Sequence, residues 1–400
     1  MNAFNRKARS TARSLAVIAL TGATCLLLPF AAIARILRSR RGALRSFWIG
    51  APILNLSNLC RAERSLGVDA RTLVTSTYFI TREFDYDLSR YRSIPVLGHL
   101  LQGLVFLWLC AVADRLHLYC DRGALPSRGR FGFNPLELRV YSWLRIETFF
   151  WTYGADVRTR QATLDLGEPN CCTECTAVNV ACICDSQLHA RNFARIRRHA
   201  TGVFSMGDMI EYTPGSRNDL FFWAIDIDAN GGDRYRPSYS DYDGNRPLRV
   251  VHAPNHRAFK GTRFLEAAVA RLRESGILVE LIMVERVAND EALRIYRGAD
   301  VIFDQCMIGF HGYFALEGMA LGKTVMCFIR KPDQYLLEPD ECPIVNVTIQ
   351  TIASRLAEMA ANPAQVRASG VRGRRYIERH FTVDAVAARM ARAYAELGLT

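Results

Sequence analysis

The chain has 400 residues, of which 50% are hydrophobic, and its formal net charge is +12. This length is too great for one compact core and predicts two domains. Nine basic residues and no acid lie within residues 1–45, so the remaining 355 residues carry only +3. Charge concentrated in this way does not form a groove-binding face, and no nucleic-acid partner is expected.

An apolar, charge-free run occupies residues 14–34, between the basic residues. About 20 apolar residues in a helix span the core of a bilayer. A cleaved signal peptide has a shorter apolar stretch and a small-residue cleavage site. Residues 1–45 are therefore predicted to form an uncleaved membrane anchor, with a surface-lying or re-entrant helix bent at Pro29, or a cleaved or misassigned start, as the alternatives.

The basic residues on both sides of this run orient an anchor only weakly. The larger basic cluster faces the folded domains and favours keeping them in the cytoplasm, at the inner membrane, whose lipid is an expected partner. The basic residues are Arg6, Lys7, Arg9, Arg13, Arg35, Arg38, Arg40, Arg41 and Arg45.

Strand and helix patterns alternate along the first half of the chain. The strand-like segments are residues 46–50, 71–77, 115–120 and 145–153, and the helix-like segments are residues 54–67, 95–113 and 135–144. Residues 95–113 are apolar enough to raise a second membrane span as an alternative. The strand that follows them at once favours a buried helix packed on a sheet. The alternation predicts a parallel sheet with helices on both faces.

The second half repeats the alternation. Its strand-like segments are residues 247–254, 278–284, 300–305 and 324–329, and its helix-like segments are residues 262–276, 289–299 and one that starts near Tyr313. Residues 226–246, rich in Gly, Pro, Asp and Tyr, are predicted to be a linker. The predicted fold is α/β, with two doubly wound Rossmann-like domains over residues 46–225 and 247–382. A cleft between them is the expected ligand site.

A glycine-rich loop precedes the helix that starts near Tyr313. Gly309 and Gly312 allow the backbone to approach a ligand, and free N–H groups at a helix start attract phosphate. Glu317 lies one turn into that helix. Its carboxylate could simply interact with the helix dipole, or it could accept hydrogen bonds from two ribose hydroxyls. The residues alone leave both interpretations open.

Residues 315–325, with the sequence ALEGMALGKTV, resemble a signature of the family-4 glycosyltransferases, which have the GT-B fold. The family signature has two glutamates separated by seven residues. The resemblance implies that Glu317 is the second acid, which holds the ribose of a nucleotide sugar. The first acid, which contacts the donor sugar, would fall at Gly309 and is missing. Donor contacts would then come from backbone N–H groups at Phe310, His311 and Gly312.

Residues 252–262 resemble the segment in which this family places a basic pair on the donor diphosphate. Lys260 matches the lysine of a Lys-Gly pair, and Arg257 matches its arginine partner at a shorter spacing than usual. Two cations at the carboxyl end of a strand can neutralise a diphosphate leaving group. A solvated basic loop is the alternative.

Residues 152–158 resemble a loop that faces the cleft in bacterial members of the family. Asp156 becomes a candidate catalytic residue, and Tyr153 and Arg158 become candidate acceptor or sugar contacts. Many members have histidine where Tyr153 stands. A turn in which Asp156 pairs with Arg158 is the alternative. The resemblance extends over about residues 46–397, and residues 383–400 are expected to form a C-terminal helix that crosses back to the first domain.

The resemblance implies a hexosyltransferase of polysaccharide biosynthesis. It would move a sugar from a nucleotide-sugar donor to a hydroxyl of a glycan or lipid-linked acceptor, with retention of configuration and without a cofactor. The first domain would bind the acceptor and the second the donor. Another GT-B enzyme, such as a nucleotide-sugar epimerase, and a non-catalytic nucleotide- or glycan-binding protein are the alternatives.

Five of the twelve cysteines lie within residues 171–184, and the other seven are scattered singly in apolar contexts, as in a reducing compartment. Four thiolates close together can hold a structural zinc ion. An iron–sulfur cluster, reduced thiols and disulfides are the alternatives. The candidate ligands are Cys172, Cys175, Cys182 and Cys184. Two Asp-x-Asp patterns, at residues 226–228 and 241–243, lie in the predicted linker and are not expected to bind metal.

Overall fold

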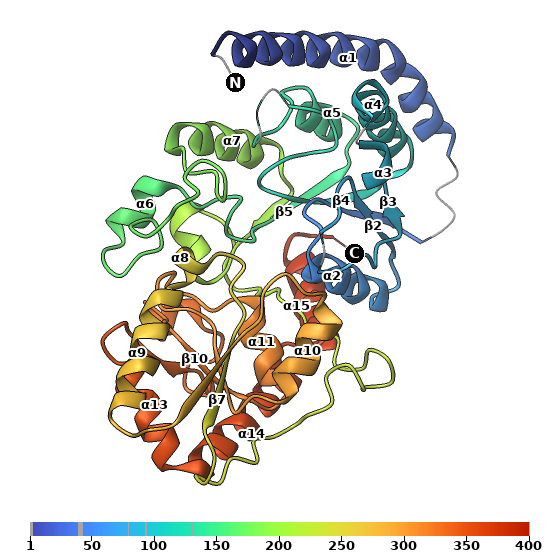
Figure 1. Cartoon of the computed structure of the whole chain (residues 1–400). Coiled ribbons are helices and arrows are strands. Elements are labelled where there is room, and N and C mark those ends of the chain that lie inside the picture. The colour runs from blue at the N-terminus through green and yellow to red at the C-terminus, as the bar shows by residue number, and fades with distance from the viewer. Residues whose placement is uncertain are drawn as a thin grey trace.

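The computed structural model describes residues 3–38, 43–78, 80–92, 94–127, 129 and 131–399. Arg40 and Arg41 of the predicted basic flank lie outside the described residues. Two α/β domains lie one above the other, and helix α1 (Ala3–Leu37) crosses the far end of the first (Figure 1). The two α/β domains predicted from the alternating strand and helix patterns are therefore confirmed.

The first domain is built on a parallel sheet with the strand order β3-β2-β1-β4-β5-β6 in the described residues. All five residues of β4 are buried, which requires cover on both faces of the sheet. The strands are β1 (Arg45–Ile49), β2 (Asp69–Val74), β3 (Tyr86–Asp87), β4 (Arg115–Tyr119), β5 (Glu147–Trp151) and β6 (Gly202–Phe204). The helices are α2 (Leu54–Ser65), α3 (Ser89–Arg92), α4 (Pro95–Val112), α5 (Glu137–Trp143), α6 (Arg160–Asp165), α7 (Ser186–His199) and the 3-10 helix η1 (Gly207–Tyr212).

The second domain has a parallel sheet with the order β11-β10-β9-β7-β8. Its helix α9 buries Leu265, Ala268, Val269 and Leu272, whose spacing puts them on one helical face. The strands are β7 (Leu248–His252), β8 (Val279–Met283), β9 (Val301–Phe303), β10 (Thr324–Cys327) and β11 (Val345–Asn346). The helices of this domain are α8 (Arg257–Lys260), α9 (Thr262–Glu274), α10 (Asn289–Arg297), α11 (Tyr313–Ala320), α12 (Pro332–Tyr335), α13 (Ile352–Ala361) and α14 (Pro363–His380). The last helix of the chain is α15 (Val383–Glu396).

A buried polar network fastens α2 and α15 to the first sheet. Glu63 of α2 accepts hydrogen bonds from Ser46, Trp48 and Arg115, and from His117 Nε2 at 3.1 Å. Trp151 Nε1 donates to His117 Nδ1, so the histidine proton lies on Nε2 and points at Glu63. Burial opposes ionisation of Glu63, yet His117, Ser46 and Arg115 together lower its pKa to about 2. Helix α15 also contacts this network, through Arg115.

The Arg115 guanidinium lies 4.4 Å from the ring centre of Tyr394 in α15, and α15 also packs on α2. The last helix of the chain therefore lies against the first domain, although α13 and α14 before it belong to the second (Figure 1).

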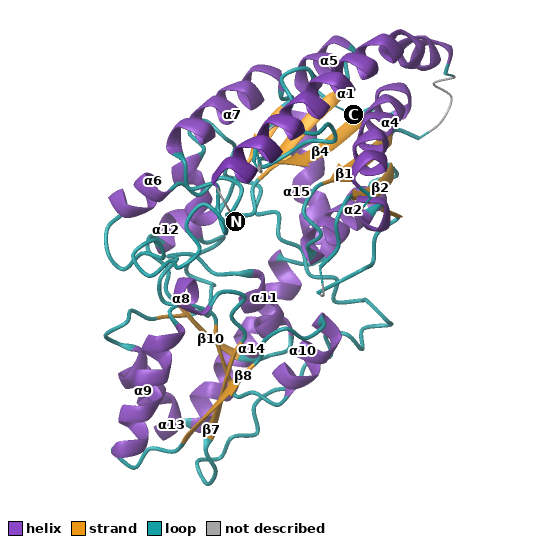
Figure 2. Cartoon of the chain, turned by 45° about the horizontal axis from the view of Figure 1, so that its top comes forward, coloured by secondary structure: helices purple, strands orange, loops and turns teal. Residues whose placement is uncertain are grey.

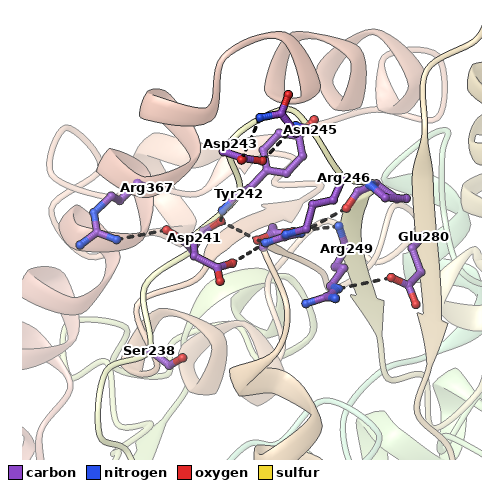
Figure 3. A network of polar contacts seen from close by, with 12 residues as sticks. Ser238, Asp241, Tyr242, Asp243, Asn245, Arg246, Arg249, Glu280 and Arg367 are labelled. Carbon is purple, nitrogen blue, oxygen red and sulfur yellow. Dashed lines mark hydrogen bonds and ion pairs between the residues drawn. The ribbon is translucent and has the colours of Figure 1, made fainter.

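Residues 226–246 form neither helix nor strand. Asp226 and Arg234 pair with the first domain, and Ser238 donates to the carbonyl of Arg297 in the second. Figure 3 shows the final turn of this segment, where Arg246 binds Asp241 at 2.5 Å and Asn245 donates to Asp243. Arg246 also binds the buried Asp300 at 2.6 Å. The acids of the second Asp-x-Asp pattern thus close a turn and fix it to the domain.

Candidate functional site between the two domains

Lys260, Asp304 and Gly312 meet at the carboxyl edge of the second sheet. Lys260 ends α8 and is only 9% exposed, and its Nζ lies 2.6 Å from Asp304 Oδ1. Asp304 follows β9 directly, and its Oδ2 accepts the backbone N–H of Gly312. The N–H of Gly312, which the resemblance assigned to the donor sugar, therefore binds a carboxylate of the protein itself. Asp304 was not identified from the sequence, although it lies near the end of the predicted strand 300–305.

Arg257 does not share this arrangement. Its side chain is half exposed, and it pairs with Glu285 at 3.1 Å and with Glu266 at 3.4 Å. Arg257 and Lys260 lie in the same short helix, but their cationic groups bind different carboxylates. The geometry therefore presents Lys260 to the loop before α11 and leaves Arg257 in a surface ion pair.

Glu317 lies in α11, behind the same loop, and is 4% exposed. Its Oε1 accepts a hydrogen bond from Asn289 Nδ2 at 2.8 Å and one from the Tyr235 hydroxyl at 3.1 Å. Burial raises the Glu317 pKa to about 7, against the effect of these two bonds and of Arg234. A carboxyl group held close to its ionisation point in the interior is typical of functional sites.

The loop between Gly309 and Gly312 packs against the first domain. The Phe310 ring is buried, with its centre 5.5 Å from Trp223, and a side chain at Gly207 would overlap it. The His311 ring lies 4.2 Å from Phe310. Burial lowers the His311 pKa to about 4, so this side chain is neutral at pH 7. Phe310 and His311 thus exclude water from the contact between the domains.

A second group of buried polar side chains lies at the carboxyl edge of the first sheet. Asp156 Oδ1 accepts the backbone N–H groups of Tyr153 and Gly154, each at 2.9 Å, and Oδ2 accepts that of Cys120 at 3.2 Å. Burial, together with the nearby charge of Asp121, raises the Asp156 pKa to about 7. Asp156 therefore braces the turn after β5 with backbone bonds and does not pair with Arg158.

Asp121 is a second acid at this edge, and the sequence analysis missed it. Its Oδ2 accepts the Tyr153 hydroxyl at 3.2 Å, and burial raises its pKa. Its Oδ1, like the hydroxyl of Tyr119, is buried with no hydrogen-bond partner among the described residues. The hydroxyl of Tyr313, the first residue of α11, accepts a hydrogen bond from Asn58 of α2 and donates to the carbonyl of Ala224, so the start of α11 lies against the first domain. The signal was available, because Asp121 directly follows the predicted strand 115–120.

Arg158 connects the two domains. It is buried, binds Asp208 Oδ2 at 2.5 Å, and lies 5.5 Å from the ring centre of Phe259 in α8. Arg158 is thus placed beside the helix that holds Lys260, with its charge balanced by Asp208.

The cysteine cluster lies beside this contact. Cys172 and Cys182 are buried, and Cys175 and Cys184 are half-buried free thiols. Within the described part of the chain, no three His, Cys, Asp or Glu side chains form a group that could hold a metal ion. The structural zinc stays a prediction, to be tested by metal analysis.

No family model and no curated protein matches this chain by sequence. Solved structures do match it. Sucrose-phosphate synthase from Thermosynechococcus elongatus has a TM-score of 0.58 at 13% identity, over 90% of this chain and 99% of the other. A glycosyltransferase from Rickettsia africae has a TM-score of 0.56 at 10% identity, over the same shares of the two chains. Such low identity shows the fold alone, and the chain has the GT-B fold, with two parallel-sheet α/β domains and an apolar helix before them.

Proposed function

We propose that the protein is a glycosyltransferase that moves a sugar from a nucleotide-sugar donor to a hydroxyl of a glycan or lipid-linked acceptor, with retention of configuration. One observation carries the proposal. Lys260 is held by Asp304 at the carboxyl edge of the second sheet, Glu317 is buried in α11, and the buried acids Asp121 and Asp156 lie at the carboxyl edge of the first sheet. The GT-B fold of two solved structures described as a glycosyltransferase and a sucrose-phosphate synthase supports it.

The second domain would hold the donor. A diphosphate is attracted by the Lys260 ammonium and by the first N–H groups of α11, which have no partner within the helix. Asp304 keeps Lys260 in place and balances its charge until the diphosphate arrives. Charge grows on the diphosphate as the glycosidic bond breaks, so a fixed cation stabilises the transition state more than the bound donor. Glu317, when ionised, would accept the ribose hydroxyls.

The first domain would hold the acceptor. Asp121 has one buried oxygen without a partner among the described residues, and the Tyr153 hydroxyl orients its other oxygen. A hydroxyl of the acceptor could donate to that free oxygen. Asp156 holds the backbone of the same edge in place. The aromatic contact of Phe310 with Trp223 would keep water from competing with the acceptor.

We also propose that α1 keeps the enzyme at the inner membrane, with both domains in the cytoplasm, where nucleotide sugars are made. One helix in the described residues, Val17–Leu37, is long and apolar enough to cross a membrane by length and composition. Lipid would then be a partner of the protein, and a lipid-linked acceptor would lie within reach.

The test is turnover of labelled nucleotide sugars by the purified full chain, after a thermal-shift panel has identified a stabilising donor. Nucleotide release together with sugar transfer is expected. Conversion of the sugar without transfer would indicate an epimerase, and binding without release would indicate a non-catalytic protein. Either outcome would overturn the proposal.

Two variants of one short helix sharpen this test. Lys260→Ala is expected to lower kcat more than it raises KM, because Lys260 acts most strongly in the transition state. Arg257→Ala removes a cation from the same helix but from a surface ion pair, and serves as the matched control. An equal decrease of kcat in both variants would instead support the family resemblance, which implies that Arg257 and Lys260 act together on the diphosphate. Unchanged kcat in Lys260→Ala would place Lys260 outside the site.

A further inference from the structure

Helix α1 contacts the first domain along a narrow stripe. Its buried or half-buried positions include Val17, Thr21, Thr24, Leu28 and Ala31, which recur every three or four residues and so lie on one face. This face packs on α4, and a side chain at position 103 of α4 would contact Thr24 at 3.1 Å. The two helices therefore lie too close together for lipid to separate them.

Polar contacts fix α1 to the domain along much of its length. Arg35 donates to the carbonyl of Ala113, and Arg38 donates to the carbonyl of Val112 and pairs with Asp114. One turn after Val17, the Thr21 hydroxyl accepts a hydrogen bond from Asn134 Nδ2 at 3.0 Å. These contacts join α1 to the C-terminal end of α4 and to the loop before α5. A helix that stood across a bilayer, away from the domain, would lose all of them.

Most other residues of α1 between Ile18 and Ala34 are apolar and exposed. Between Val17 and Ala34 the helix carries no charge, and side chains such as Leu26, at 78%, and Phe30, at 70%, are open to the surroundings. Helix α4, on which α1 packs, has exposed apolar side chains of its own, Leu100, Leu104 and Trp108. A helix that is apolar on all sides needs an apolar environment, and a patch of this extent marks an interaction site.

We infer that α1 lies flat in the interface of one membrane leaflet, and that α1 and α4 together form a single lipid-facing surface. This inference rests on the membrane attachment proposed above and adds its geometry. Lipid is favoured over a second copy of the chain because residues 1–45 carry nine basic residues and no acid. Two such segments would repel each other, whereas anionic headgroups would attract them.

The orientation of α1 determines on which side of the membrane the N-terminus lies. Helix α1 crosses the end of the first domain that is remote from the second domain (Figures 1 and 2). A flat α1 keeps the N-terminus and both domains on the same side of the membrane. A spanning α1 would put the N-terminus on the opposite side.

Sidedness is tested with the full chain carrying one epitope tag at each end, expressed in a bacterium. Both tags are expected to resist external protease in spheroplasts and to be digested in inverted inner-membrane vesicles. Digestion of the N-terminal tag alone in spheroplasts would show that α1 spans the membrane, which overturns the flat arrangement but not the attachment. Recovery of the full chain in the soluble fraction would overturn the attachment as well.

A matched pair of variants tests the shared surface. Leu104→Glu puts a charge on the exposed side of α4 and is expected to weaken binding to phosphatidylglycerol vesicles by about tenfold or more. Leu278→Glu, at a position 61% exposed beside β8 of the second domain, should bind like the unchanged protein. Equal melting temperatures would show that both variants fold. If Leu104→Glu binds vesicles as well as Leu278→Glu does, α1 alone holds the membrane and the shared surface is refuted.

Discussion

Replacing Glu317 with glutamine is expected to stabilise the fold above pH 7 and to weaken nucleotide binding. Burial raises the Glu317 pKa to about 7 even though Asn289 and Tyr235 donate to its Oε1. At higher pH the folded protein must hold a buried carboxylate, whereas the unfolded chain ionises the same group in water. Glutamine has the same shape, keeps an acceptor oxygen for both donors and does not ionise. Alanine is less informative, because it leaves both donors unpaired in the core.

The rise of the pKa from 4.5 to about 7 corresponds to about 3 kcal/mol. Below pH 4.5 the carboxyl group is protonated in both the folded and the unfolded state. Between pH 4.5 and pH 7 the unfolded chain loses the proton while the folded protein retains it. The unfolding free energy of the unchanged protein therefore falls with rising pH relative to that of the glutamine variant, and the full difference is reached above pH 7.

Urea unfolding of both proteins at pH 5 and pH 8 measures this difference. Other groups that titrate in this range, such as Asp156, are present in both proteins and cancel in the comparison. Calorimetric titration with the donor nucleotide at pH 8 should show binding weaker by about 1–3 kcal/mol in the variant, because a neutral amide replaces the charged acceptor. If the unfolding free energies of the two proteins change equally between pH 5 and pH 8, the effect on stability is refuted. If the two proteins bind the nucleotide with equal affinity, the role in nucleotide binding is refuted.

Three further outcomes are expected. Asp121→Asn should lower the Asp156 pKa, because the charge of Asp121 helps to raise it; an unchanged titration of the Asp156 carboxyl group by NMR would contradict this. Gly207→Ala should lower the melting temperature more than Gly215→Ala does. Both glycines have positive φ, but only at Gly207 would the added carbon overlap the Phe310 ring, so equal losses would exclude an effect of that contact. Purified protein should contain about one zinc per chain, lost in the Cys172→Ser/Cys175→Ser variant; reduced protein without zinc would end that prediction.

The predicted and observed secondary structure agree well for the strands at the centre of each sheet. Strands β4, β5, β7 and β10 lie within the predicted segments, because a strand covered on both faces must be a nearly continuous apolar run. Helix α9 was equally clear, since its apolar residues follow the helical period. The polar residues within β4, Arg115 and His117, do not show in such a pattern, because their partner Glu63 lies on another element.

Some residues of the candidate site could be proposed from the sequence, and others could not. Lys260, Gly309, Gly312 and Glu317 could be proposed from the sequence because they form local motifs around strand ends. Their partners could not, because the bonds join distant parts of the chain. Asp304 lies 44 residues from Lys260, and Tyr235 lies 82 residues from Glu317. Arg257 and Lys260 look alike in the sequence, and only burial and the choice of carboxylate separate them.

By itself, the sequence determined the two α/β domains, the apolar N-terminal segment with its basic flanks, and the glycine-rich turn before Glu317. These features depend on composition and on short periods, which need no distant partner. Only the tertiary structure decided that Asp304 holds Lys260, that Asp121 lies beside Tyr153, and that α1 is fixed along α4 by Arg35 and Arg38. Each of these depends on contacts between segments far apart in the chain, and such contacts exist only once the chain has folded.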